Sequence, residues 1–207
     1  RLSATGALKA NAQTLSLSDA RISIDGNTLE GSLVYSGRNL RPVLSGTLAA
    51  DQLQLKPLLA PLPSPLGRDR AWSREPLLSS RERPFDLDLR LSVARARYQQ
   101  TQIQSAGLAI KAQDGQYDIS LIDSLIYGGH LKGRMNMASS TEGLTARANL
   151  AFTSMDAGAL ANDLFGAKWI GGALGGQMTL ESNGSCFEEL VQNLNGRLDA
   201  SIENGDP

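Results

Sequence analysis

The sequence has very little of the residue types that carry most enzyme and metal chemistry. Among its 207 residues there is one cysteine, Cys186, and one histidine, His130. A single cysteine excludes an internal disulfide and leaves the redox compartment undetermined. A single histidine excludes a histidine-rich metal site and a relay between two imidazoles. We interpret His130 as a residue at the start of a strand and Cys186 as an inert, partly buried thiol.

The sequence also lacks a charge excess and a long hydrophobic run. It has 20 Lys and Arg against 21 Asp and Glu, so its net charge of −1 excludes the basic surplus of a typical nucleic-acid-binding protein. No run approaches the roughly 18 apolar residues of a membrane-spanning helix, and no signal peptide opens the chain. The chain begins within a strand-like pattern and ends on a turn signal, so we expect a fragment of a longer protein.

What the sequence does contain is a strong two-residue alternation of apolar and polar side chains, clearest between Pro84 and Met137. Leu87, Leu89 and Leu91 alternate there with charged and polar residues, the period of a strand with one buried face. The Asp114-Gly115 pair suits a tight hairpin, because both central residues of a type I′ turn have positive φ. The pattern predicts antiparallel neighbours in a meander, with a core of aliphatic residues since only 5% of the chain is aromatic.

Three segments follow from composition and spacing. Residues 1–56 contain short strand-like runs about ten residues apart, which is typical of all-β structure. Residues 57–84 contain six prolines and several arginines, and so predict an irregular loop. This loop is either a lid or partner contact with arginines facing phosphates, or a solvated connection with Trp72 against the sheet edge. We expect residues 85–207 to form one continuous sheet with 1–56.

Near the C-terminus the period changes twice to that of a helix. Residues 155–164 fit helical spacing, with Ser154 as the N-cap and Gly166 as the stop. A second helix is predicted after Ser185, which with Glu188 matches the S-x-x-E capping box. The predicted fold class is mainly β, a curved antiparallel β-meander or groove with two short α-helices near the C-terminus.

The chain carries no persuasive catalytic constellation, so we predict no enzyme activity, cofactor or metal. Asp86 and Asp88 share one strand face and are either a cation site or part of a solvated outer face. The glycines of 171–176 precede a strand rather than the helix N-terminus that a phosphate loop needs. Asn183 opens a possible glycosylation acceptor, although the same residues fit the start of a helix.

A succession of short motifs resembles the AsmA family of bacterial envelope proteins. Each motif is weak alone, but together they follow the family's order through most of the chain. At the end, Asp206-Pro207 departs from the family's apolar continuation, which favours truncation or a tag. The motifs are Gly31–Tyr35 with Arg41–Leu48, Trp72–Leu77, Tyr127-Gly128-Gly129, Asp156–Leu160, Gly172–Leu180, Gly184–Leu190 and Leu194–Leu198.

Some strands carry apolar residues on both faces. We therefore expect one face of the sheet to pack against the helices or the loop and the other face to line an apolar space. Ile119, Leu121 and Leu125 are expected to point one way and Ile122 and Ile126 the other. A closed sandwich core is the alternative. The resemblance implies that the curved sheet forms a groove for acyl chains, as it does in bridge-like lipid-transfer proteins. The candidate lipid-binding residues are Leu87, Leu89, Leu91, Leu108, Ile110, Leu121, Leu125, Leu131, Met135, Leu150 and Phe152.

The resemblance implies a non-enzymatic, periplasm-facing module of a protein anchored in the inner membrane of a Gram-negative bacterium. It would bind or conduct phospholipid in outer-membrane biogenesis, with the membrane reached through segments outside this fragment. Outer-membrane assembly proteins are possible partners, and nucleic acid is not expected. The alternative is a structural or protein-binding β-module that scaffolds outer-membrane protein assembly without lipid.

Overall fold

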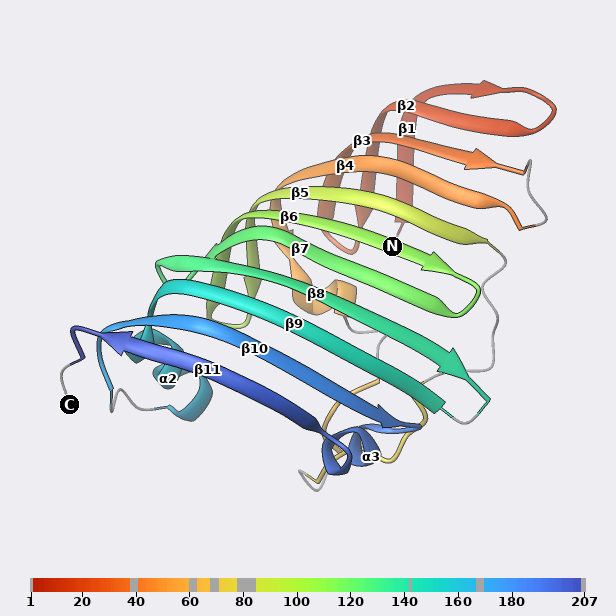
Figure 1. The fold of residues 1–207 in the computed structure, drawn as a ribbon. Coiled ribbons are helices and arrows are strands. Elements are labelled where there is room, and N and C mark those ends of the chain that lie inside the picture. Colours follow the sequence, from red (N-terminus) through yellow and green to blue (C-terminus); the bar gives the residue numbers. More distant parts are fainter. Residues whose placement is uncertain are drawn as a thin grey trace.

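The fold is one open sheet whose eleven strands follow each other in chain order (Figure 1). The computed structural model describes residues 2–37, 41–59, 63–67, 71–77, 85–141, 143–166 and 170–205. The strands are β1 (Leu2–Ala10), β2 (Thr14–Ile24), β3 (Asn27–Ser36), β4 (Val43–Gln54), β5 (Asp86–Tyr98), β6 (Thr101–Gln113), β7 (Gln116–Ile126), β8 (Gly129–Ser140), β9 (Gly143–Asp156), β10 (Ala173–Gly184) and β11 (Asn195–Glu203). The helices are α1 (Leu55–Leu59), α2 (Ala157–Phe165) and α3 (Phe187–Gln192).

Tight two-residue turns join several neighbouring strands, as the sequence predicted for Asp114-Gly115. Asp114 and Gly115 have φ of 47° and 75°, and they connect β6 to β7 where Gln113 pairs with Gln116. Tyr127 and Gly128, with φ of 50° and 74°, connect β7 to β8 in the same way. Positive φ at both central residues matches the right-handed twist of the flanking strands. The mainly β fold class and the meander are therefore confirmed.

One pair of strands departs from the antiparallel pattern. β4 and β5 are parallel, with Leu44 opposite Leu87 and Leu53 opposite Ala96. A parallel pair needs a long crossover, and the proline-rich connection between β4 and β5 supplies it. The loop predicted over 57–84 thus has a topological role that its composition alone did not reveal. Some of its residues, including Pro61, Pro84 and four of its arginines, lie outside the described residues.

Register shifts in several strand pairs contribute to the bend of the strands. Shifts occur in the pairings of β1 with β2, β2 with β3, β6 with β7, β7 with β8 and β9 with β10. Asp19, Ser105 and Ser154, on β2, β6 and β9, have positive φ of 48°, 50° and 54°. Bulges of this kind bend a strand and increase its twist. Figure 1 shows the resulting arch, with the three helices on its concave side.

The two helices predicted near the C-terminus are present, with different first residues and caps. Asp156, not Ser154, is the N-cap of α2, because its carboxylate accepts a hydrogen bond of 2.9 Å from the Ala159 amide. Met155 remains in β9 and is buried. The predicted stop is confirmed, since Gly166 ends α2 with φ of 74°. The third helix, α1, lies where the sequence predicted only strand and loop.

The capping box of α3 uses a different glutamate from the one predicted. Ser185 donates from its backbone N and its Oγ to Glu189 Oε2, at 2.7 and 2.9 Å. The N-cap by backbone conformation is Cys186, whose side chain makes no cap hydrogen bond. Glu188 instead bonds to Arg74, more than a hundred residues earlier in the chain. The S-x-x-E spacing could not anticipate this competing tertiary partner.

The main buried cluster lies where α1 packs on the concave side. Leu53 of β4 and Val93 of β5 are 3% and 5% exposed, and α1 adds Leu55 and Leu58 to the same cluster. This places the apolar side chains of β4 and β5 on the side of the sheet that the helices cover. We call this side the inner face and the opposite side the outer face.

Candidate ligand-binding face

The inner face is mainly aliphatic from β4 to β9, because the register aligns the apolar positions of neighbouring strands. One row runs through Leu48, Leu91, Leu108, Leu121 and Gly133, each directly opposite the next. Side chains opposite each other in a sheet point to the same side. A parallel row is formed by Gly46, Leu89, Ile110, Ile119, Met135 and Ala148.

The register brings ten of the eleven predicted lipid-binding residues onto this one face. Leu131 lies opposite Phe152, and Leu150 lies between Gly133 and Met178. Together with the two rows above, the ten are Leu87, Leu89, Leu91, Leu108, Ile110, Leu121, Leu131, Met135, Leu150 and Phe152. Whether they bind lipid stays a prediction.

Leu125 is the exception, and the prediction that it points the same way as Leu121 is wrong. The pairing of β7 shifts register between Leu121 and Leu125, so that Leu125 lies opposite Gln104 and His130 on the outer face. The same bulge turns Ile126 to the inner face, opposite Ile103 of the buried cluster. Ile122 points outward, as expected, and is 60% exposed. Strict alternation fails here because one bulge inverts the side of every later residue.

Coverage of the inner face is uneven. Val93, Leu144 and Phe152 are each at most 9% exposed, and α1 packs against the cluster that contains Val93. In the middle, Leu89, Ile110 and their row neighbours are only half-buried. A closed sandwich would bury these central residues, since a second layer would cover them. Among the described residues the inner face is therefore an aliphatic surface that the helices cover only in part.

On the outer face, several charged residues form ion pairs across neighbouring strands. The guanidinium of Arg134 on β8 binds the carboxylate of Asp118 on β7, and this contact holds the pKa of Asp118 below its ordinary value. Similar pairs join Arg147 to Glu181 and Arg21 to Glu30. Exposed ion pairs of this kind contribute little to stability, but they identify the outer face as a solvent-exposed surface. The two faces of the sheet thus differ sharply in chemistry.

At one end of the inner face, α2 is held to the turns of the sheet through Asp163. Its Oδ2 accepts hydrogen bonds of 2.5 Å from Thr101 Oγ1 and 2.6 Å from the Tyr127 hydroxyl. These two bonds lower the pKa of Asp163. Burial and the neighbouring Asp163 raise the pKa of Tyr127. Tyr127, noted in the sequence only as part of a corner, is therefore an anchor for α2, which local sequence could not show.

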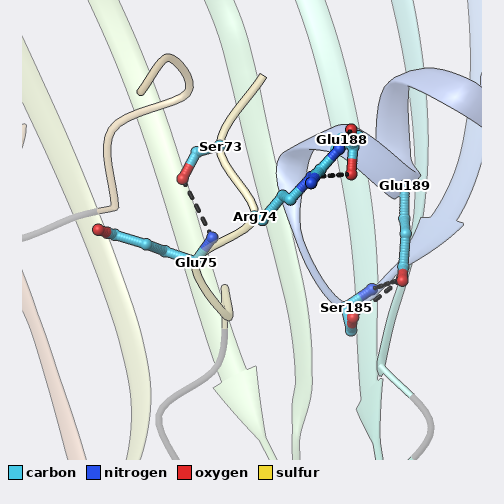
Figure 2. A network of polar contacts seen from close by, with 6 residues as sticks. All are labelled: Ser73, Arg74, Glu75, Ser185, Glu188 and Glu189. Atoms are coloured by element: carbon cyan, nitrogen blue, oxygen red, sulfur yellow. Dashed lines mark hydrogen bonds and ion pairs between the residues drawn. The ribbon is translucent and has the colours of Figure 1, made fainter. Parts of the chain in front are cut away.

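At the other end, α3 is held by the described parts of the proline-rich loop, residues 63–67 and 71–77, which we call the strap. Figure 2 shows the ion pair at its centre: Arg74 Nε and Nη2 donate to the carboxylate of Glu188 at 2.7 and 2.8 Å. This contact lowers the pKa of Glu188. Ser73 is 6% exposed, and its Oγ accepts a hydrogen bond of 3.2 Å from the Glu75 amide. The strap and α3 therefore lie together at this end of the inner face.

The polar residues singled out from the sequence have ordinary partners. Asp86 is buried and lies 3.3 Å from Arg41 Nε, while Asp88 lies 3.9 Å from Lys111 Nζ. His130 Nδ1 is 3.3 Å from one carboxylate oxygen of Asp123. Within the described ranges no group of three His, Cys, Asp or Glu residues could hold a metal ion. None of the helices in the described ranges is long and apolar enough to cross a membrane.

Comparison with known proteins gives one match. A model of the AsmA family matches residues 64–206. No curated protein and no solved structure matches the chain significantly. The matched range covers more than half of the chain, including the strap, α2, α3 and strands β5 to β11.

Proposed function

Because the chain belongs to the AsmA family, a family of the bacterial envelope, we propose that it is a non-enzymatic module that binds the acyl chains of phospholipid. The observation that supports this proposal most directly is the half-buried middle of the inner face, aliphatic across adjacent strands. In this proposal the module faces the periplasm during outer-membrane biogenesis. The full-length protein is anchored in the inner membrane by segments outside this sequence.

The dimensions of the inner face suit an acyl chain. Neighbouring strands lie about 4.8 Å apart, so the six steps from β4 to β10 span roughly 29 Å. The hydrocarbon core of a bilayer is about 30 Å thick and contains two opposed chains. A row across these strands is therefore about twice as long as one acyl chain. Each methylene that the face shields from water contributes about 0.8 kcal/mol to the free energy of binding. In this proposal the polar headgroup stays in contact with water.

Two adjacent residues on opposite faces allow a direct test. Leu121 lies on the inner face opposite Leu108, and Ile122 beside it is 60% exposed on the outer face. We expect Leu121→Asp to weaken phospholipid binding by about tenfold or more, because it places a carboxylate against the acyl chain. The control Ile122→Asp should bind as the unchanged chain does. Native mass spectrometry of co-purified lipid and titration with fluorescent phospholipid measure both.

Absence of co-purified lipid together with absence of uptake by the unchanged chain would contradict the proposal. Equal loss in both variants would point to a general effect of charge rather than to the inner face. Circular dichroism of each variant checks that the sheet is intact, so that a folding defect is not mistaken for lost binding.

A scaffold for outer-membrane protein assembly is the second candidate, and the open edges of the sheet favour it. Every residue of β1 and of β11 is exposed, and each strand pairs on one side only. An unpaired edge offers backbone donors and acceptors to a strand of another protein. If this is the function, lysine or proline substitutions in β11 should abolish partner capture, while Leu121→Asp should leave it unchanged.

A further inference from the structure

Two arginines of β5 and four glutamines of the neighbouring strands form a polar cluster on the outer face. In the register of β4, β5 and β6, each arginine lies directly between two glutamines. Side chains at directly opposite positions point to the same side of a sheet. We call this set the Arg–Gln cluster, and its members are Gln52, Gln54, Arg95, Arg97, Gln102 and Gln104.

The backbone under the Arg–Gln cluster is held by the main buried cluster of the inner face. Successive residues of a strand point to opposite faces, so the residue between the two cluster members of each strand points inward. Leu53 and Ala96 in these positions are 3% and 6% exposed, and Ile103 packs against the same core. The side chain of Arg97 is also held, because its Nε donates to the Gln99 carbonyl at 3.1 Å. The Arg–Gln cluster therefore lies on a well-packed part of the sheet.

The neighbours of these two arginines differ from those of three other arginines on the outer face. Arg21, Arg134 and Arg147 each bind a carboxylate of a neighbouring strand. Glutamine has the length of glutamate but carries no charge, so it does not neutralise a guanidinium beside it. In the part of the chain that the structure describes, no ion pair involves Arg95 or Arg97. Their Cα atoms are roughly 6.6 Å apart, so the two positive charges repel each other unless an anion lies between them.

An open cleft of about 330 Å³ follows the Arg–Gln cluster and is lined by all six of its residues. None of the described residues that line this cleft carries a carboxylate. Guanidinium groups bind phosphate through paired N–H donors, and glutamine amides can donate to the same oxygens. We propose that the Arg–Gln cluster binds a phosphate group, which lies between Arg95 and Arg97 and accepts hydrogen bonds from the glutamines on either side.

Two kinds of molecule can supply such a phosphate. One is an anionic phospholipid, whose headgroup presents it at a membrane surface, and the other is a soluble phosphate ester. All six side chains of the Arg–Gln cluster are exposed, so the site is open to both. It lies on the face opposite to the one proposed for acyl chains, and each of the two sites can therefore be tested without the other.

Vesicle binding tests the first source. We expect the unchanged chain to co-sediment with vesicles of phosphatidylglycerol and phosphatidylcholine in equal parts, but not with pure phosphatidylcholine vesicles. The double variant Arg95→Gln, Arg97→Gln should bind roughly 30-fold more weakly, about fivefold for each arginine. The control is the double variant Arg90→Gln, Arg197→Gln, which removes the same charge from exposed positions of the outer face. It should bind nearly as the unchanged chain does.

Titration with glycerol phosphate tests the second source. NMR follows the arginine Nε–H signals, and binding should shift those of Arg95 and Arg97 but not that of Arg90. Shifts of this kind without vesicle binding would support the site and identify a soluble ester as its ligand. Vesicle binding that depends on Arg95 and Arg97 would support the site and identify the headgroup.

Three results would overturn the site. They are neither vesicle binding nor NMR shifts, equal losses in the two double variants, and shifts spread over all exposed arginines. The proposed acyl-chain binding would not be affected by any of them. Conversely, Leu121→Asp on the inner face should leave phosphate binding unchanged.

A further variant tests the role of the uncharged glutamines. Gln104→Glu places a carboxylate opposite Arg95, and we expect it to weaken phosphate binding about fivefold, because it neutralises one arginine. Gln116→Glu is the matched control, since it adds the same charge on the outer face opposite Gln113 and Ala138. The control should bind as the unchanged chain does. Equal weakening by both variants, or none by Gln104→Glu, would overturn the site.

Discussion

At the scale of single residues, two neighbouring glycines show how closely the backbone is packed where the sheet bends. Gly128 has φ of 74°, and a Cβ there would meet nothing within 4 Å. Gly129 is buried, and a Cβ there would lie 2.4 Å from the Thr153 carbonyl oxygen and 2.5 Å from the Met155 amide nitrogen. Ser154, between these two β9 residues, has the positive φ of the bulge. Glycine thus serves the turn at one position and a close strand approach at the next.

We therefore expect the two alanine substitutions to differ in cost. Gly128→Ala places alanine in the left-handed region, which costs roughly 1–2 kcal/mol. Gly129→Ala pushes against backbone atoms that cannot rotate away, and we expect about 3 kcal/mol. Urea titration of both variants measures the free energy of unfolding. A smaller loss for Gly129→Ala than for Gly128→Ala would contradict the close approach of β8 to the β9 bulge.

At the scale of elements, α2 is docked by one carboxylate, which makes its attachment sensitive to acid. The pKa of Asp163 is lowered below its ordinary value of 3.8 by the bonds from Thr101 and Tyr127. A group with a lowered pKa in the folded state stabilises that state above its unfolded pKa, and this contribution is lost as pH falls through the folded pKa. Docking of α2 should therefore weaken below about pH 4, even while the strands remain paired.

Hydrogen exchange of the α2 amides, corrected for intrinsic rates, should show this loss in acid before the strands lose protection. In Tyr127→Phe one of the two bonds is gone, so we expect the pKa of Asp163 to move up toward 3.8 in an NMR titration. Tyr35→Phe, on β3, is the control and should leave that pKa unchanged. An unchanged Asp163 pKa in Tyr127→Phe would show that the tyrosine does not hold α2.

At the scale of the whole molecule, the sheet keeps most of its aliphatic residues on one side, and the described parts of the chain cover that side only in part. The outer face is exposed to solvent and carries charged residues, while the inner face is half-buried at Leu89, Ile110 and their neighbours. Such a surface is stabilised by any apolar ligand that covers it in the folded state only. Among the described residues, the middle of this surface is the part that the helices and the strap leave half-buried.

A soluble short-chain phospholipid should therefore raise the melting temperature. At a ligand concentration 100 times Kd, binding to the folded state adds about 2.7 kcal/mol. Dihexanoyl phosphatidylcholine below its micelle concentration is a suitable probe, and calorimetry gives the shift. The Leu121→Asp variant should show a smaller shift than Ile122→Asp. A melting temperature that falls or stays constant for the unchanged chain would argue against a ligand-binding inner face.

Local sequence determined the strands, their turns and most of the inner face. Alternation of apolar and polar residues and pairs such as Asp114-Gly115 act over a few residues, so they are readable without the fold. Ten of the eleven candidate residues lie on one face for this reason. Leu125 does not, because a bulge is a matter of pairing with β6 and β8 rather than of the β7 sequence.

Only the tertiary structure decided which segments meet across long distances in the chain. The parallel pairing of β4 with β5, the bond of Glu188 to Arg74 and the anchoring of α2 by Tyr127 join residues that no local period connects. The same holds for which part of the aliphatic face the helices bury and which part they leave half-exposed. The sequence itself fixes the alternation of apolar and polar side chains along each strand. How much of the inner face is covered depends instead on how the sheet bends and where the helices pack.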